Sequence, residues 1–115
     1  MSLTNTQVAE TYLQALESKD PSRARLAPDV TLQYPLSPRM ISGDASVIEY
    51  LSAMMTAIDA VEIERHISEG DYVVTLWQAH TVWGVIPVCH VFQIAEETIR
   101  EIRSFFDPRQ IGPLR

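Results

Sequence analysis

The residues best suited to proton chemistry lie in a long stretch of the sequence that carries no formal charge. From Tyr72 to Ala95 there is no Asp, Glu, Lys or Arg, yet His80 and His90 fall within it. An imidazole has an ordinary pKa of about 6.5, so it can accept and return a proton near neutral pH, as enolisation, cyclisation or water activation requires. Burial would lower that pKa and keep the ring neutral. We predict His90 as the acid/base of a site; the alternative is a buried structural histidine.

Tyrosines and tryptophans supply the other candidate groups. Tyr12 could donate a hydrogen bond to a substrate carbonyl oxygen as negative charge develops there, or it could be an ordinary packed aromatic. Tyr34 is unsuited to act as a base near neutral pH, because a phenol has a pKa of about 10, so we expect it to orient a ligand. Either face of the hairpin over residues 72–94 could line a pocket, since pockets and interfaces both favour aromatic side chains. The expected substrate-binding residues are Trp77, His80, Trp83, Phe92 and Asp107.

Length and composition bound the class of protein. The chain has 115 residues, of which 46% are hydrophobic, and this length fits a single domain over residues 1–115. Its one cysteine, Cys89, excludes an intramolecular disulfide and a cysteine-rich zinc site. The sequence contains no Gly-rich phosphate loop, metal-ligand motif or nucleophile elbow. We therefore expect neither a metal nor a cofactor.

The formal charge of −6 argues against two classes of partner. Nucleic acids and anionic membrane surfaces both attract cationic proteins, so we expect neither. Polar residues and a turn signal at residues 83–87 interrupt the uncharged stretch, which argues against a membrane span. Residues 1–7 lack the pattern of a secretory signal, and we expect a cytoplasmic protein.

Three helices are predicted in the first half of the chain. Residues 8–16 carry an apolar stripe at helical spacing, and Lys19-Asp20-Pro21 should end that helix. A short second helix is predicted over residues 22–27. Asp44 is placed to cap a third helix, whose apolar stripe runs over residues 47–58. The sequence also predicts a short strand over residues 30–34.

The second half of the chain changes to the two-residue period of strands. His66 falls in phase with Glu62 and Glu64, so we expect it to face solvent. The uncharged hairpin should be buried on both faces or nearly so, because a solvated face would carry charges. The order ααβαββββ predicts an α+β fold with helices gathered at one face of a mainly antiparallel sheet. The predicted strands cover residues 61–67, 72–82, 86–94 and 98–106.

Three stretches of sequence, together with this order of elements, resemble a known family. They are VAETYLQAL at residues 8–16, APDVTL at 27–32 and IRSFFDP at 102–108. Together they resemble the NTF2-like superfamily, most of all its SnoaL-like proteins and ketosteroid isomerases, over residues 6–110. The resemblance implies a conical barrel, with three N-terminal helices on a strongly curved sheet around a deep apolar pocket, and a homodimer through the outer sheet face.

The resemblance also implies roles for particular positions. Tyr12 corresponds to the tyrosine that donates to the oxyanion in the isomerases. Their catalytic aspartate before a proline corresponds to Tyr34, so that route to isomerisation is doubtful here. The strand that carries a further acid matches residues 89–94. Keeping its alternation in phase places His90 at that position, which we favour, whereas an ungapped alignment places Cys89 there.

These observations lead to one hypothesis and two alternatives. The chain is predicted to be a SnoaL-like protein that binds a small hydrophobic carbonyl, polyketide-like or steroid-like compound. The prediction leans towards a cofactor-independent enzyme that isomerises, cyclises, hydrates or dehydrates that compound, with His90 as acid/base and Tyr12 and Tyr34 orienting the oxygen. The first alternative is a pocket that binds without chemistry, which the lack of a pocket carboxylate favours. The second is a dimeric interaction module, because one fold of this kind serves many functions.

Overall fold

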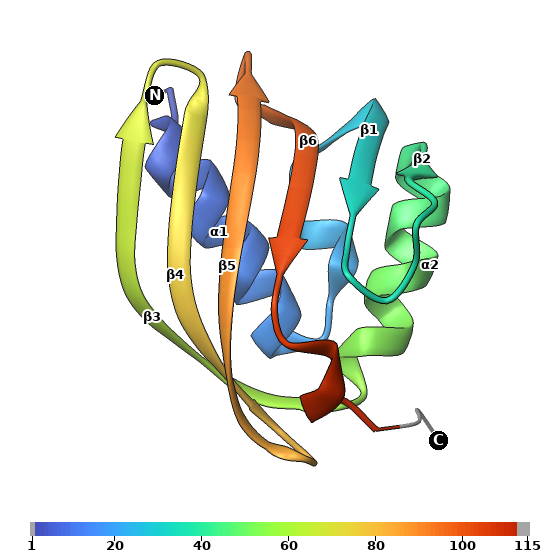
Figure 1. The fold of residues 1–115 in the computed structure, drawn as a ribbon. Helices are drawn as coiled ribbons and strands as arrows, with labels where there is room; N and C mark the ends of the chain where they lie inside the picture. Colours follow the sequence, from blue (N-terminus) through green and yellow to red (C-terminus); the bar gives the residue numbers. More distant parts are fainter. Residues whose placement is uncertain (1, 113–115) are drawn as a thin grey trace.

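A computed structural model describes residues 2–112, which form two α-helices and one sheet (Figure 1). Two short 3-10 helices, η1 and η2, complete the fold. The elements are α1 (Asn5–Ser18), η1 (Pro21–Arg23), β1 (Leu26–Gln33), β2 (Ile41–Ser42), α2 (Asp44–Met55), β3 (Ile58–Glu69), β4 (Tyr72–Thr81), β5 (Gly84–Ala95), β6 (Thr98–Phe105) and η2 (Pro108–Gln110).

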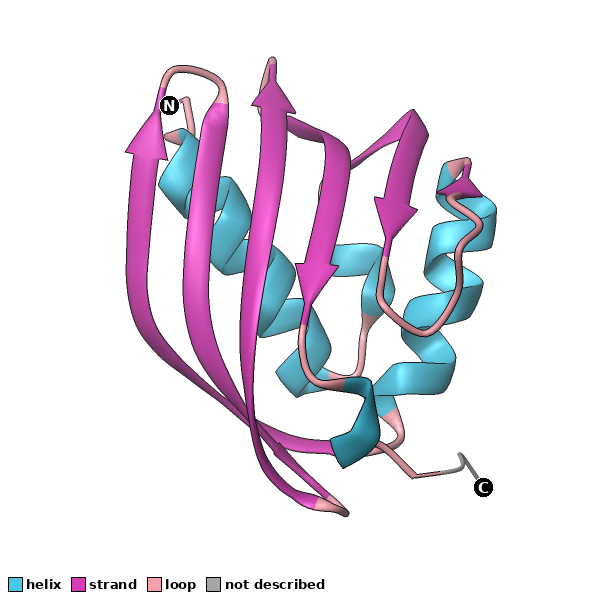
Figure 2. Ribbon diagram, viewed as in Figure 1, coloured by secondary structure: helices cyan, strands magenta, loops and turns pink. Residues whose placement is uncertain are grey.

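The six strands form one open sheet in the order β2-β1-β6-β5-β4-β3. Strands β1 and β6 pair in parallel, and the other neighbours pair antiparallel. Both α-helices lie on the same side of the sheet (Figure 2). The predicted α+β plan, with helices on one face of a mainly antiparallel sheet, is therefore confirmed. The conical barrel is not formed, because the edge strands β2 and β3 do not pair with each other.

Helix α1 begins and ends as its sequence dictates. The Thr4 hydroxyl accepts from the Gln7 backbone N–H, and the Gln7 side chain accepts from the Thr4 N–H, so both otherwise unpaired donors are satisfied. At the other end Lys19 adopts a left-handed conformation, with φ of 60°, and its N–H bonds back to the helix. The Lys19 ammonium donates to the carbonyls of Met55 and Ile58, which ties α1 to the chain leaving α2.

The predicted second helix over residues 22–27 is wrong. Asp20 caps only the single turn of η1, and Ala24 already has extended backbone. Strand β1 then starts at Leu26 and pairs with β6, so pairing in the sheet replaces the expected helix. The register shifts between Leu26 and Thr31, where Pro28 has no N–H to give to the ladder. The N-terminal half thus contributes two α-helices, not three.

Helix α2 starts one residue earlier than a cap at Asp44 would require. Its N-cap is Gly43, which contributes no side-chain bond, while the Asp44 carboxylate accepts from the Ala45 N–H at 2.8 Å. The apolar stripe predicted over residues 47–58 is confirmed as far as Met55, because the helix buries Val47, Leu51 and Met55. The helix ends there, and Ile58 already begins β3.

The uncharged hairpin is confirmed as β4 and β5 near the middle of the sheet. Its turn is tighter than the predicted 83–87 segment, because Gly84 with φ of 116° already begins β5. Pro87 sits inside the strand opposite Gln78. A proline is tolerated there because β6 joins β5 only from Cys89 onward, so Pro87 has a neighbouring strand on one side alone.

A β-bulge in β3 overturns the expectation that His66 faces solvent. Ile63 pairs with Trp77 but Arg65 pairs with Leu76, so β3 contains one residue more than β4 at this point. The extra residue reverses the alternation beyond it. His66 therefore turns to the helix-covered face, where its Nδ1 lies 2.8 Å from the Thr75 hydroxyl, while Ile67 is left half exposed.

Only one face of the hairpin is buried in the single chain. The helix-covered face, which we call the inner face, carries buried side chains such as Val73 and Phe92. The opposite, outer face leaves large apolar side chains exposed. The expectation of burial on both faces is therefore not met within one chain, because α1 and α2 cover only the inner face (Figure 2). The exposed apolar side chains on the outer face of β4, β5 and β6 are Tyr72, Leu76, Val85 and Phe105.

Candidate functional site

A small apolar pocket lies between the two helices and the inner face of the sheet. Its volume is about 50 Å³. One water-sized group needs roughly 10–15 Å³ measured this way, so the pocket has room for a few such groups. Aliphatic and aromatic side chains make most of its wall, and no charged residue lines it. The side chains in its wall that can form hydrogen bonds are Tyr12, Tyr50, Trp77, Thr81, Trp83, His90 and Ser104.

His90 is fixed in one tautomer by Trp77. The Trp77 Nε1–H donates to His90 Nδ1 at 2.8 Å, and the two rings lie nearly parallel, at 14°. An indole N–H can only donate, so Nδ1 must be the bare nitrogen of a neutral imidazole. The proton of His90 is therefore on Nε2. Among residues 2–112 nothing accepts a hydrogen bond from that N–H, which leaves it as a donor for a bound molecule.

Burial determines the charge of His90. The side chain is 5% exposed, and desolvation lowers the pKa of His90 to about 3. The ring is therefore neutral at physiological pH. A general base works best with a pKa near the operating pH, and a pKa this low makes His90 a weak one. As a neutral ring with its proton on Nε2, it is arranged to donate.

Tyr12 brings a second neutral donor to the same pocket. It lies on the buried stripe of α1 and meets the His90 ring edge-on, with centroids 5.6 Å apart. Burial, with a contribution from nearby Tyr50, raises the pKa of Tyr12 far above its ordinary value. The phenol therefore keeps its proton. Within the described residues its hydroxyl forms no hydrogen bond to another side chain or to the backbone.

Tyr50 is a pocket residue that the sequence interpretation missed. It lies on α2, and burial raises the pKa of its phenol. Its ring packs on that of Tyr34 with centroids 4.5 Å apart. The signal was present, because Tyr50 falls three residues after Val47 and so belongs to the inward side of the helix.

Comparison with known proteins identifies the chain. A family model described as Domain of unknown function (DUF4904) matches residues 2–112. The chain belongs to this family. No match was found among the curated proteins. Solved structures of the same fold do match, and several of them are described as NTF2-like proteins.

Three of these solved structures show how far the likeness extends. An NTF2-like protein of unknown function from Burkholderia pseudomallei is 24% identical, covers 98% of this chain and 100% of its own, and has a TM-score of 0.76. A protein from Jannaschia sp. provisionally assigned as a SnoaL-like polyketide cyclase is 16% identical over 93% and 91% of the two chains, with a TM-score of 0.76. A provisionally assigned ketosteroid isomerase from Kribbella flavida is 15% identical over 95% and 82%, with a TM-score of 0.79. The DUF4904 domain thus has the NTF2-like fold that the resemblance implied.

The DUF4904 domain brings together four of the predicted site residues: Tyr12, Trp77, Trp83 and His90 line the pocket. Phe92 lies beside them, fully buried, with its ring 5.1 Å from that of Tyr12. The face of the hairpin that carries the tryptophans is therefore the pocket face.

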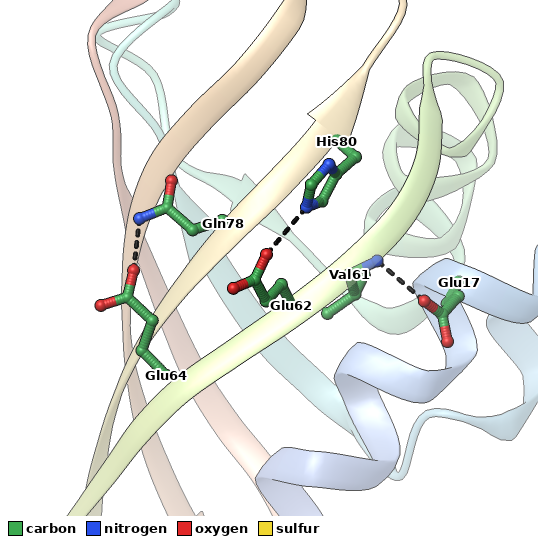
Figure 3. A network of polar contacts seen from close by, with 6 residues as sticks. All are labelled: Glu17, Val61, Glu62, Glu64, Gln78 and His80. Carbon is green, nitrogen blue, oxygen red and sulfur yellow. Dashed lines mark hydrogen bonds and ion pairs between the residues drawn. The ribbon is translucent and has the colours of Figure 1, made fainter.

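His80, Asp107 and Tyr34 lie outside this pocket. His80 is on the outer face of β4, where its Nε2 lies 3.0 Å from Glu62 Oε1; Figure 3 shows this pair beside the Gln78–Glu64 bond. Asp107 accepts from the Arg109 N–H as it caps η2, and the Arg109 side chain lowers the pKa of Asp107. Tyr34 lines a second, neighbouring groove.

The register of β5 shows which of His90 and Cys89 faces the pocket. His90 pairs with Thr75 and Ser104 and faces the pocket. Cys89 pairs with Leu76 and Phe105, which are exposed on the outer face. Of these two residues, His90 is therefore the one that faces the pocket, and its correspondence to the acid of the resemblance stays a prediction.

Two further observations concern the whole described part of this DUF4904 domain. Among residues 2–112, no three His, Cys, Asp or Glu side chains gather closely enough to hold a metal ion. None of the helices in that range is both long and apolar enough to span a bilayer.

Proposed function

We propose that the pocket binds a small apolar compound with a carbonyl group, whose oxygen accepts hydrogen bonds from Tyr12 and His90. One observation carries the proposal: the bond from Trp77 holds the His90 proton on Nε2, in a pocket with no charged residue. The His90 Nε2–H has no partner among residues 2–112, and a hydrogen bond from it to a ligand oxygen would contribute about 0.5–1.5 kcal/mol. A carbonyl oxygen has two lone pairs and can accept from both groups.

The volume of the pocket limits the size of the ligand. About 50 Å³ suits a compound with a few carbon atoms beside the carbonyl, such as a short ketone. A steroid-like or polyketide-like compound would require Tyr50, Met54 or other wall side chains to move. A small ligand is therefore the simpler occupant of this pocket.

Catalysis of enolisation is the second candidate function, and the pair of neutral donors favours it. Donors aimed at the oxygen on which charge develops stabilise an enolate. The wall of the pocket has no carboxylate, and the pKa of His90 is about 3, so the proton would have to leave to water or to a group on the ligand. Exchange of the α-hydrogens of a bound ketone with D2O, followed by NMR, measures this activity directly.

Binding is tested with two small ligands of the same shape, butanone and 2-methylbut-1-ene, of which only the ketone has an acceptor. We expect Tyr12→Phe to weaken butanone binding by roughly 3- to 10-fold, the worth of one hydrogen bond, and to leave binding of 2-methylbut-1-ene unaffected. Tyr72→Phe, on the outer face, is the matched control and should change neither affinity. Equal binding of the two ligands to the unmodified protein, measured by NMR titration, would refute the proposed donors.

We also propose that two copies of the chain associate through the outer face. The exposed apolar side chains lie on the central strands β4, β5 and β6, and the segment 72–95 has no charge to oppose close approach of a second copy. Leu76→Arg, near the middle of this face, should convert a dimer into a monomer in sedimentation velocity. Ile67→Arg, on the edge strand β3, is the control and should preserve the dimer. A monomeric unmodified protein at micromolar concentration would contradict the association.

A further inference from the structure

A second groove opens beside the pocket, between the loop that follows β1 and the end of β6. Its volume is about 370 Å³, several times that of the pocket. The loop contributes Tyr34, Ser37 and Arg39 to its wall, and β6 contributes Arg103 and Ser104. Polar groups from two elements that are far apart in the sequence therefore face one space.

The register of the sheet explains how this groove arises. The pairing of β1 with β6 ends at Gln33 opposite Arg103, whereas β5 continues along β6 to Phe105. The last residues of β6 thus have no strand on the β1 side, which leaves a notch in the sheet (Figure 1). At a notch, alternate side chains of one strand can border the same space. Arg103 of the outer face and Ser104 of the inner face both line the groove.

The groove is positively charged in an otherwise acidic chain. Its charged wall residues are Arg39 and Arg103, with no Asp or Glu among them, although the whole chain carries −6. Arg103 Nε lies 3.3 Å from Glu101 Oε1, which engages one edge of its guanidinium and leaves its other N–H groups available. Arg39 has no ion pair with any of residues 2–112.

Ser104 lies in the wall of both the groove and the apolar pocket. It lines both spaces, and it is the cross-strand neighbour of His90. Side chains directly opposite each other on paired strands have Cβ atoms about 5 Å apart. The His90 donor and the groove are therefore about one residue apart, a separation that a molecule a few carbons long can span.

We propose that the ligand of the pocket is a small amphipathic carboxylate, with its apolar part and carbonyl oxygen in the pocket and its carboxylate between Arg39 and Arg103. This inference rests on the proposed function and names its ligand class, a short oxo acid. A carboxylate suits the site because guanidinium groups bind it through paired, charge-assisted hydrogen bonds. Ser37, Ser104 and the Tyr34 hydroxyl supply further donors beside it.

The test uses methyl-ketone acids from 4-oxopentanoate to 6-oxoheptanoate, each compared with its own methyl ester, which has the same chain but no charge. We expect at least one acid to bind about tenfold more tightly than its ester at low salt, since a desolvated charge-assisted pair contributes more than a neutral one. Arg39→Gln and Arg103→Gln should each reduce the ratio of acid affinity to ester affinity severalfold and leave the affinity for the ester unchanged. Arg65→Gln, which removes an exposed arginine of β3 outside the groove, is the matched control and should preserve the ratio.

A pocket variant separates this inference from the proposed function. Ala79→Leu fills part of the pocket and should abolish binding of acid and ester alike, with circular dichroism confirming the fold. If acid and ester bind the unmodified protein equally well and both lose binding in Ala79→Leu, the proposed carboxylate site between Arg39 and Arg103 is refuted. The proposed binding function of the pocket then still stands. Acid binding that survives Ala79→Leu but not Arg103→Gln would mean an adventitious ion only. If neither these compounds nor butanone bound, both proposals would be overturned.

Discussion

The burial of His90 predicts a specific loss of stability in mild acid. The pKa of His90 is about 3 in the folded protein, because burial disfavours the imidazolium, against an ordinary 6.5 in the unfolded chain. Between these two values the unfolded chain binds a proton at this position and the folded chain does not. The contribution of neutral His90 to stability is therefore complete above pH 6.5 and is lost progressively as the pH falls below it.

The size of the effect follows from the difference between the two pKa values. Each pH unit within that window is worth about 1.4 kcal/mol, so lowering the pH from 6.5 to 4 should cost roughly 3 kcal/mol. A domain of this length has a typical unfolding free energy of about 5–15 kcal/mol, so the loss is large enough to measure. Carboxylates that titrate over the same range add their own contribution, which has to be subtracted.

The subtraction uses His90→Gln, whose side chain keeps an acceptor within reach of Trp77 but does not titrate. Urea unfolding followed by far-UV circular dichroism at pH 7, 5.5 and 4 gives the free energy of unfolding of both proteins. We expect the unmodified protein to lose about 3 kcal/mol more than the variant over this range. Equal losses, or an NMR titration of the His90 ring in the folded protein near pH 6, would refute the argument that burial keeps it neutral.

Three further variants test other contacts. Trp77→Phe leaves His90 Nδ1 buried without its donor, so unfolding by urea should show a loss of about 1–3 kcal/mol, and the ¹⁵N shifts of His90 should indicate mixed tautomers; an unchanged single tautomer would contradict the assignment. Gly112→Ala places a Cβ 2.5 Å from Trp83 Nε1, so the indole signal of Trp83 should move in NMR spectra. Gly70→Ala, which meets open space, should cost about 1 kcal/mol for its positive φ and leave that signal in place.

The sequence predicted well those elements whose periodicity agrees with their final burial. The stripe of α1 packs against the sheet, so local pattern and tertiary packing coincide there. The uncharged segment was correctly predicted as a hairpin, although only its inner face is buried within one chain. The segment 22–27 failed because its preference is weak and the decisive contact, pairing with β6, comes from residues some seventy positions later. A local pattern carries no information about that contact.

The sequence predicted those site residues whose direction follows from the alternation of side chains along a strand. It did not predict contacts between side chains of different elements. His90 and Trp77 follow from alternation once the hairpin is recognised, because their registers place both on one face. The bond between them is a tertiary detail, and it changes the chemistry: a histidine expected to take a proton has its accepting nitrogen already occupied. His80 was predicted from its residue type, and β4 directs it to the outer face. Tyr34 was predicted from its correspondence to the aspartate of the isomerases, and it follows the end of β1 and lines the groove instead.

The bulge in β3 shows why alternation misleads on an edge strand. Up to Ile63 the pattern and the structure agree, and a single extra residue then exchanges the faces, so that His66 turns inward and Ile67 outward. Extra residues cost little at an edge, because only one neighbouring ladder is disturbed. They also twist the strand and make an edge less able to pair with another chain. The central strands β4 and β5 pair residue for residue from Tyr72 opposite Gln93 to Thr81 opposite Gly84 without such an interruption, which keeps His90 opposite Thr75 on the inner face. Strands β5 and β6 likewise pair without a shift from Cys89 to Gln93, which keeps His90 opposite Ser104, the residue that the pocket and the groove share.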